Sequence, residues 1–171
     1  MGREARIMKN KMPVGLDDFK KLVEKDYYLV DKTGFIKDFL DDHSDVTLIT
    51  RPRRFGKTLT LSMLRYFFTL QEAGENRKLF ENLAIARAGE EYMAFQGTRP
   101  VIFITLKDVK TSSWESCLEQ IKIEMSDVYN EFHELASSDK LSPLQKKIFD
   151  NILNRASLSG DLEKSLYFLS Q

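Results

Sequence analysis

A short basic loop between an apolar run and an amphipathic segment constrains the fold of this chain more than any other feature. The loop occupies residues 51–58, with the sequence RPRRFGKT, and follows the apolar run VTLIT at residues 46–50. After the loop, apolar side chains recur at helical spacing over residues 59–70, so they lie on one side of a helix. A strand, a loop that ends in Gly-Lys-Thr and then a helix form the pattern of a phosphate-binding P-loop.

The residue types of this loop suit a bound anion. Gly56 lets the backbone approach a ligand closely because it has no Cβ, and the N–H groups at the start of a helix attract negative charge. Lys57 is expected to reach the terminal phosphates, and the Thr58 hydroxyl is expected to hold Mg²⁺. We therefore predict an ATP site with Mg²⁺ as its metal. The predicted nucleotide contacts are Arg53, Arg54, Phe55, Gly56, Lys57, Thr58 and Leu59.

Two features of the loop leave alternatives open. Arg51 stands where the motif has its first glycine. If that position needs a positive φ, the arginine costs about 1–3 kcal/mol of strain, and if its backbone is extended the substitution costs nothing. Arg53 and Arg54 either contact phosphates and stabilise transition-state charge, or form a solvated basic rim.

A second apolar run at residues 101–106 follows Pro100 and has the composition of a strand buried on both faces. Helical spacing recurs at about residues 118–135, and Ser142-Pro143 begins a helix that continues to about residue 153. Strands that alternate with helices predict an α/β fold, here a P-loop NTPase-like parallel sheet with flanking helices. Residues 1–12 are basic and polar and are predicted to be a flexible tail before a domain at 13–171.

Composition excludes several classes of protein. The 26 basic and 26 acidic residues balance to a net charge of zero, which argues against a generally basic nucleic-acid binder. The only cysteine, Cys117, allows neither an internal disulfide nor a cysteine-based zinc site, so a cytoplasmic location is the default expectation. No apolar run approaches the roughly 20 residues that span a bilayer, so no membrane partner is expected.

Four stretches together resemble the AAA-ATPase-like domain family. They are YLVDKT at 28–33, FI at 35–36, RPRRFGKTL at 51–59 and the segment from PVI to LKD at 100–108. The family comprises mostly bacterial proteins in which a P-loop ATPase domain precedes a nuclease-like domain of the PD-(D/E)XK type. The resemblance covers nearly all of residues 14–171 and implies ATP binding. It also places Tyr28 or Val30 near the nucleotide base, with burial of both in the core as the alternative.

ATPases of this kind also need a second acidic motif, the Walker B strand, whose carboxylates hold Mg²⁺ and polarise the attacking water. No run in this sequence fits that motif, and Asp108, which follows Lys107, is a poor match. We therefore expect the N-terminal part of an ATPase domain, truncated before the Walker B strand. Such a chain is expected to bind nucleotide without hydrolysing it alone.

Two other functions stay open at this point. The chain could be a non-hydrolysing protein-interaction module with a vestigial P-loop, or the N-terminal half of a nuclease-linked ATPase in DNA processing or defence. The expected partners are a nucleotide and either a second copy of the chain or a missing C-terminal half. Contact with nucleic acid is expected only through a full-length protein.

Overall fold

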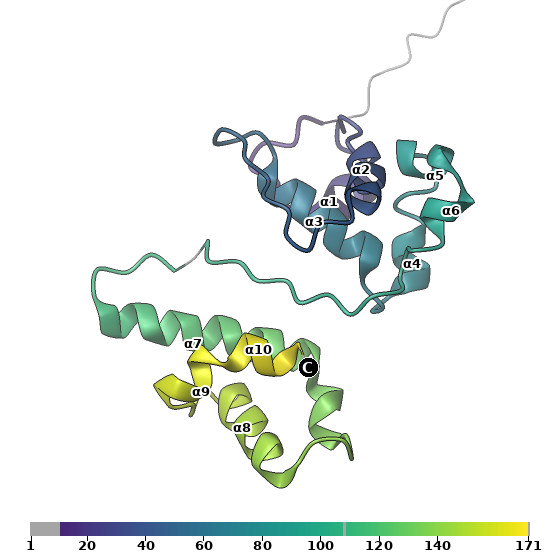
Figure 1. Cartoon of the computed structure of the whole chain (residues 1–171). Coiled ribbons are helices and arrows are strands. Elements are labelled where there is room, and N and C mark those ends of the chain that lie inside the picture. The colour runs from purple at the N-terminus through teal and green to yellow at the C-terminus, as the bar shows by residue number, and fades with distance from the viewer. Residues whose placement is uncertain (1–10, 108, 171) are drawn as a thin grey trace, which may run out of the picture. The chain divides into compact units, whose positions relative to one another are not determined.

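The computed structural model describes residues 11–107 and 109–170, and its regular elements are helices joined by loops and turns (Figure 1). The described residues divide at Val101 and Ile102 into two compact units. The helices of the first unit are α1 (Phe19–Glu24), α2 (Gly34–Asp42), α3 (Lys57–Phe68), α4 (Ala73–Arg77), α5 (Ala84–Ala88) and α6 (Glu90–Met93). Those of the second are α7 (Trp114–Glu131), the 3-10 helix η1 (His133–Ser137), α8 (Pro143–Leu153), α9 (Ser159–Glu163) and α10 (Ser165–Leu169). None of the described helices is both long and apolar enough to cross a membrane.

The prediction of an α/β fold with a parallel sheet is wrong. The runs at 46–50 and 101–106 have no regular secondary structure, and Val46 and Leu48 are 85% and 83% exposed. A strand is stable only when a neighbouring strand accepts and donates its backbone hydrogen bonds. In the described part of the chain, the isolated bridges pair Lys11 with Tyr27 and Thr69 with Arg99, and neither bridge involves these runs. The two runs therefore form no strand pairing among the described residues.

Aromatic side chains hold the first unit together. Phe67 of α3 is fully buried, and its ring meets Phe80 edge-on at 5.2 Å between centroids. Phe80 in turn stacks on Phe19 of α1, also at 5.2 Å. Around these rings lies a cluster of buried side chains from most helices of the unit, namely Ile36, Met63, Leu79, Ile85 and Met93. The core therefore fixes α3, the helix that follows the basic loop, against α1 and the segment after α4.

The end of α3 is tied to the segment at residues 97–99. Gly97 N donates to Phe67 O at 2.8 Å, and Arg99 N donates to Phe68 O at 2.9 Å. Gly97 has φ +70°, and a Cβ on it would lie 2.5 Å from the Cβ of Ala73. Only glycine fits this crossing without displacing α4.

The second unit is built on the packing of α7 against α8. Its core contains Met125, Tyr129, Phe149, Ile152 and Leu162. The Tyr129 hydroxyl donates to Ser165 O at 2.8 Å, and burial raises the pKa of this tyrosine to about 12. The predicted helix at 143–153 is confirmed as α8, with Pro143 in its first turn. Ser142 and Gln145 form a capping box there.

The close crossing at Gly97 predicts a large loss of stability in Gly97→Ala. The left-handed backbone costs about 1–2 kcal/mol for alanine and the overpacking about 1–3 kcal/mol, so the free energy of unfolding should fall by about 2–4 kcal/mol. Urea denaturation measures this difference. Gly74→Ala in α4 is the matched control, because nothing lies within 4 Å of its added Cβ. Equal stability of Gly97→Ala and wild type would contradict the role of this crossing.

Candidate functional site

The basic loop leads directly into α3, as the sequence predicts. Phe55 N donates to Pro52 O in a turn, and Gly56 takes φ +77° and ψ +24° as the N-cap of the helix. Gly56 offers no side-chain cap, so the first N–H groups of α3 are available to an external acceptor. The left-handed backbone at Gly56 is one that glycine adopts without strain.

The backbone conformation of Arg51 shows whether an arginine at the motif's first glycine position causes strain. Arg51 is not among the residues with positive φ, so its replacement of the motif's glycine does not strain the backbone. Arg54 takes the left-handed conformation instead, with φ +68°. Strained residues of this kind gather at functional sites, where the surrounding structure holds them in place.

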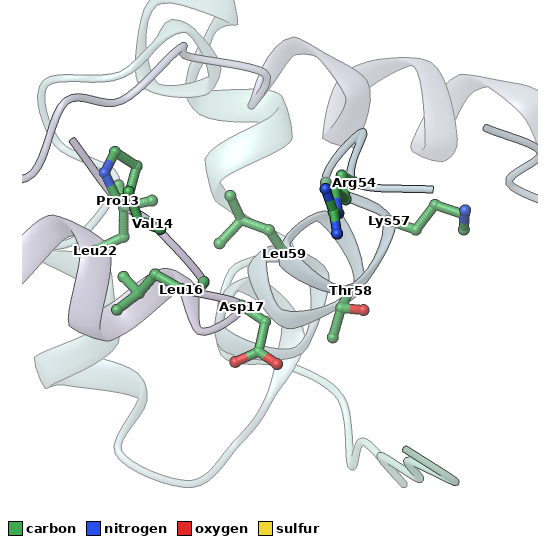
Figure 2. A pocket seen from close by; sticks show the side chains of 11 residues that line it. Pro13, Val14, Leu16, Asp17, Leu22, Arg54, Lys57, Thr58 and Leu59 are labelled. Atoms are coloured by element: carbon green, nitrogen blue, oxygen red, sulfur yellow. The ribbon is translucent and has the colours of Figure 1, made fainter. Parts of the chain in front are cut away.

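Arg54, Gly56, Lys57, Thr58 and Leu59, five of the seven predicted contact residues, line one cavity of about 800 Å³ (Figure 2). Arg54, Lys57 and Thr58 lie on one side of this cavity, which we call the loop cavity, and Pro13 and Leu22 lie on the other. The full lining is Pro13, Val14, Gly15, Leu16, Asp17, Leu22, Arg54, Gly56, Lys57, Thr58 and Leu59. Arg53 is exposed and is not part of this lining.

A second, more apolar cavity of about 390 Å³ adjoins the first, and we call it the apolar cavity. The two share the lining residues Pro13, Leu22, Arg54, Gly56 and Leu59. The apolar cavity adds Met12, Phe19, Tyr28, Leu29, Val30, Lys32, Phe55, Thr60 and Met63. Tyr28 and Val30 are 52% and 60% exposed, so the alternative that they are buried in the core is wrong.

Lys57 is held by its own loop. Its ammonium donates to Arg51 O at 2.5 Å and to Pro52 O at 3.1 Å. In Figure 2 the side chain extends away from Pro13 and Leu22. A phosphate oxygen that binds the Lys57 ammonium would have to replace these carbonyls as its acceptors or share the ammonium with them.

Among the described residues, the cations of the loop have no ion-pair partner. Within the described residues, no carboxylate oxygen lies within 4.0 Å of the side-chain nitrogens of Lys32, Arg51, Arg53, Arg54 or Lys57. Three lysines elsewhere in the unit, Lys20, Lys37 and Lys78, do have such partners, for example Lys20 with Glu72 at 2.6 Å. The loop is therefore a region of uncompensated positive charge, which attracts anions.

Asp31 and Thr33 fix the segment before α2 by capping α5, a helix that lies much later in the sequence. Ala84 N donates to Asp31 Oδ2 at 2.7 Å, and Ile85 N donates to Thr33 Oγ1 at 3.1 Å. The N-cap of α5 itself, Leu83, offers no side-chain acceptor. Asp31 Oδ1 also accepts from the backbone N and the hydroxyl of Thr33. We call this set of bonds the α5 cap.

Asp108, the poor match to the Walker B motif, lies outside the described residues. Sequence reasoning missed Asp17, which lines the loop cavity together with Thr58. It also missed the segment at 12–17, which no motif marks, and Lys32, which belongs to the YLVDKT stretch but was given no role there.

The chain belongs to the family described as "Predicted AAA-ATPase", which matches residues 13–166. A protein from Azotobacter chroococcum mcd 1, named only as an uncharacterized protein in the vnfD 5′ region, is 42% identical over 78 residues. That match covers 45% of this chain and 14% of the relative. No solved structure matched this chain. The predicted family is thus confirmed.

The α5 cap predicts a pH-dependent contribution to stability. Burial raises the pKa of Asp31, but the hydrogen bonds from Thr33 and Ala84 outweigh it and bring the pKa below the ordinary 3.8. A lowered pKa in the folded state stabilises the protein above pH 3.8, and the contribution is lost as the pH falls through the folded value. Asp31→Asn should therefore be less stable than wild type near neutral pH, by about 1–3 kcal/mol, with the difference shrinking in acid.

Urea denaturation over a series of pH values tests this prediction. Asp38→Asn is the matched control, because this aspartate lies exposed on α2. Its substitution should leave the free energy of unfolding nearly unchanged at every pH. A difference between wild type and Asp31→Asn that persists unchanged in acid would argue against an ionised cap.

Proposed function

We propose that this chain binds the phosphates of a nucleotide, ATP with Mg²⁺, at the loop that precedes α3. The observation that carries the proposal is the start of α3, where Gly56 at φ +77° opens onto a cavity lined by Arg54, Lys57 and Thr58. Membership of a family described as a predicted AAA-ATPase supports it. An apolar cavity beside the loop offers room for a base.

Each part of the phosphate site has a physical role in this proposal. The free N–H groups of α3 and its dipole attract an anion, and Lys57 supplies a positive charge. Arg54 lines both cavities, and in this proposal its guanidinium contacts phosphate oxygens. Arg53 lines neither of them and fits a solvated rim. Phe55 and Leu59 line the apolar cavity and border the base.

The residues present fit a magnesium ion bound through phosphates. In the described part of the chain, no three His, Cys, Asp or Glu side chains gather into a metal cluster. Mg²⁺ on a nucleotide needs only one or two protein ligands, because phosphates and water fill the other positions. The Thr58 hydroxyl and the Asp17 carboxylate line the same cavity and would hold it. The metal would neutralise phosphate charge.

The wider functions stay predictions for this chain. The matched relative is much longer than the segment they share, because that segment is 14% of its length. Only the resemblance and the composition support a nuclease-linked role, self-association and a cytoplasmic location. The rival interpretation, an interaction module with a vestigial loop, makes a different prediction about nucleotide binding.

Nucleotide binding should appear as a thermal shift. A ligand at about 100 times its dissociation constant adds about 2.7 kcal/mol to the stability of the folded state, so Mg-ATP should raise the Tm by several degrees. Lys57→Ala should abolish most of that shift. Lys21→Ala, an exposed lysine that lines neither cavity, should keep it. A folded wild type with no shift would favour the interaction module.

Hydrolysis should be no faster for residues 1–171 than for Lys57→Ala. Phosphoryl transfer needs both a carboxylate on the metal and a group that positions the attacking water. Asp17 is the carboxylate in the lining of the loop cavity, and one side chain cannot do both. A steady-state phosphate-release assay makes the comparison. Mg²⁺-dependent turnover that Lys57→Ala abolishes would contradict the prediction, and Asp17→Asn would then show whether Asp17 is responsible.

A further inference from the structure

We propose that Lys32 is a second phosphate-binding lysine of this site, with its ammonium on the phosphates of a nucleotide seated on the loop. The inference rests on the proposed function, because it names a further contact of the same ligand. Lys32 lies outside the P-loop motif, and the sequence pattern gave it no role.

The position of Lys32 carries the inference. Its Nζ lies 3.9 Å from the point that a Cβ on Gly56 would occupy. Lys32 also lines the apolar cavity together with Arg54, Phe55 and Gly56. The ammonium therefore lies beside the glycine that begins α3, where the helix offers its free N–H groups.

The backbone of Lys32 is fixed by its neighbours. Asp31 and Thr33 on either side make the α5 cap, and Thr33 is fully buried. Lys32 O accepts from Phe35 N at 3.0 Å in the turn that begins α2. Asp31 and Thr33 accept hydrogen bonds from the start of α5. The side chain of Lys32 takes no part in this cap and lies at the loop. A cation whose backbone is already fixed loses less entropy when it binds an anion.

The charge of Lys32 is unpaired in the part of the chain that the structure describes. Among the described residues, its ammonium has neither a carboxylate partner nor a hydrogen-bond acceptor. Lys57, by contrast, donates to two carbonyls of the loop. Positive charges that gather without an anion repel one another, and a phosphate group between them removes that repulsion.

The two adjoining cavities indicate the chemical class of the ligand. Lys32 belongs to the apolar cavity but lies at its border with the loop. A ligand that joins a flat apolar group to phosphates fills both cavities, with its charged part between Lys32 and the start of α3. A nucleoside diphosphate or triphosphate has this form, and inorganic pyrophosphate reproduces its charged part alone.

Isothermal titration of the 1–171 chain with ADP, and separately with pyrophosphate, tests the role of Lys32. Lys32→Gln should weaken the binding of both by about tenfold or more, as the loss of a charge-assisted hydrogen bond does. Lys32→Arg should keep most of the affinity, because it keeps the cation. Lys25→Gln, an exposed lysine outside both cavities, should bind like wild type. Thermal unfolding without ligand should be the same for all of these variants, because the Lys32 side chain makes no hydrogen bond or ion pair in the described part of the fold.

The outcomes separate this inference from the proposed function. Binding that survives in Lys32→Gln but is lost in Lys57→Ala would overturn the inference and leave the proposed function standing. A loss of ADP binding with unchanged pyrophosphate binding would also overturn it, because Lys32 would then contact the base. A folded wild type that binds neither ligand would overturn both.

Discussion

The buried ring of Phe67 is the contact on which the first unit depends. It lies between the end of α3 and Phe80, and Phe80 stacks on Phe19, so one aromatic cluster fixes α3 against α1. Because a helix is rigid over three turns, anchoring its C-terminal half also fixes where its N-terminus points. The loop and Gly56 are therefore positioned by an aromatic cluster of which Phe67 and Phe80 line neither cavity. The packing of the core therefore determines where the candidate site lies.

The segment DKT at 31–33 links the core to the site in a second way. Its aspartate and threonine supply the cap that α5 lacks, since Leu83 cannot accept a hydrogen bond through its side chain. The lysine between them remains beside Gly56. Of these three consecutive residues, Asp31 and Thr33 thus stabilise the fold, and Lys32 supplies positive charge at the site. An Asp31 substitution would act on both, because it would release the backbone that holds Lys32.

The parts of the fold that sequence predicted correctly depend on local signals. Ser142, Pro143 and Gln145 specify the start of α8 within four residues, and Gly56 with the apolar spacing after it specifies the start of α3. A sheet cannot be predicted in this way, because each strand depends on a partner elsewhere in the chain. The runs at 46–50 and 101–106 have the composition of strands, but neither takes part in a β-bridge in the part of the chain that the structure describes.

The same distinction applies to the candidate site. The loop motif identified Arg54, Gly56, Lys57 and Thr58, and the structure brings them to one cavity. The opposite wall, from Met12 to Asp17, carries no motif and reaches the loop only because α1 packs on α3.

All residues that line the two cavities fall between Met12 and Met63, within the first unit. The geometry at Gly56 and Arg54 forms without a strand at 46–50, so it is determined by the loop and the anchored helix. An anion site needs free N–H groups, nearby cations and a cavity, and none of these requires a sheet. The failure of the α/β prediction therefore does not remove the basis for a phosphate site. The site is then held in place by the aromatic core and the α5 cap, and not by a central strand.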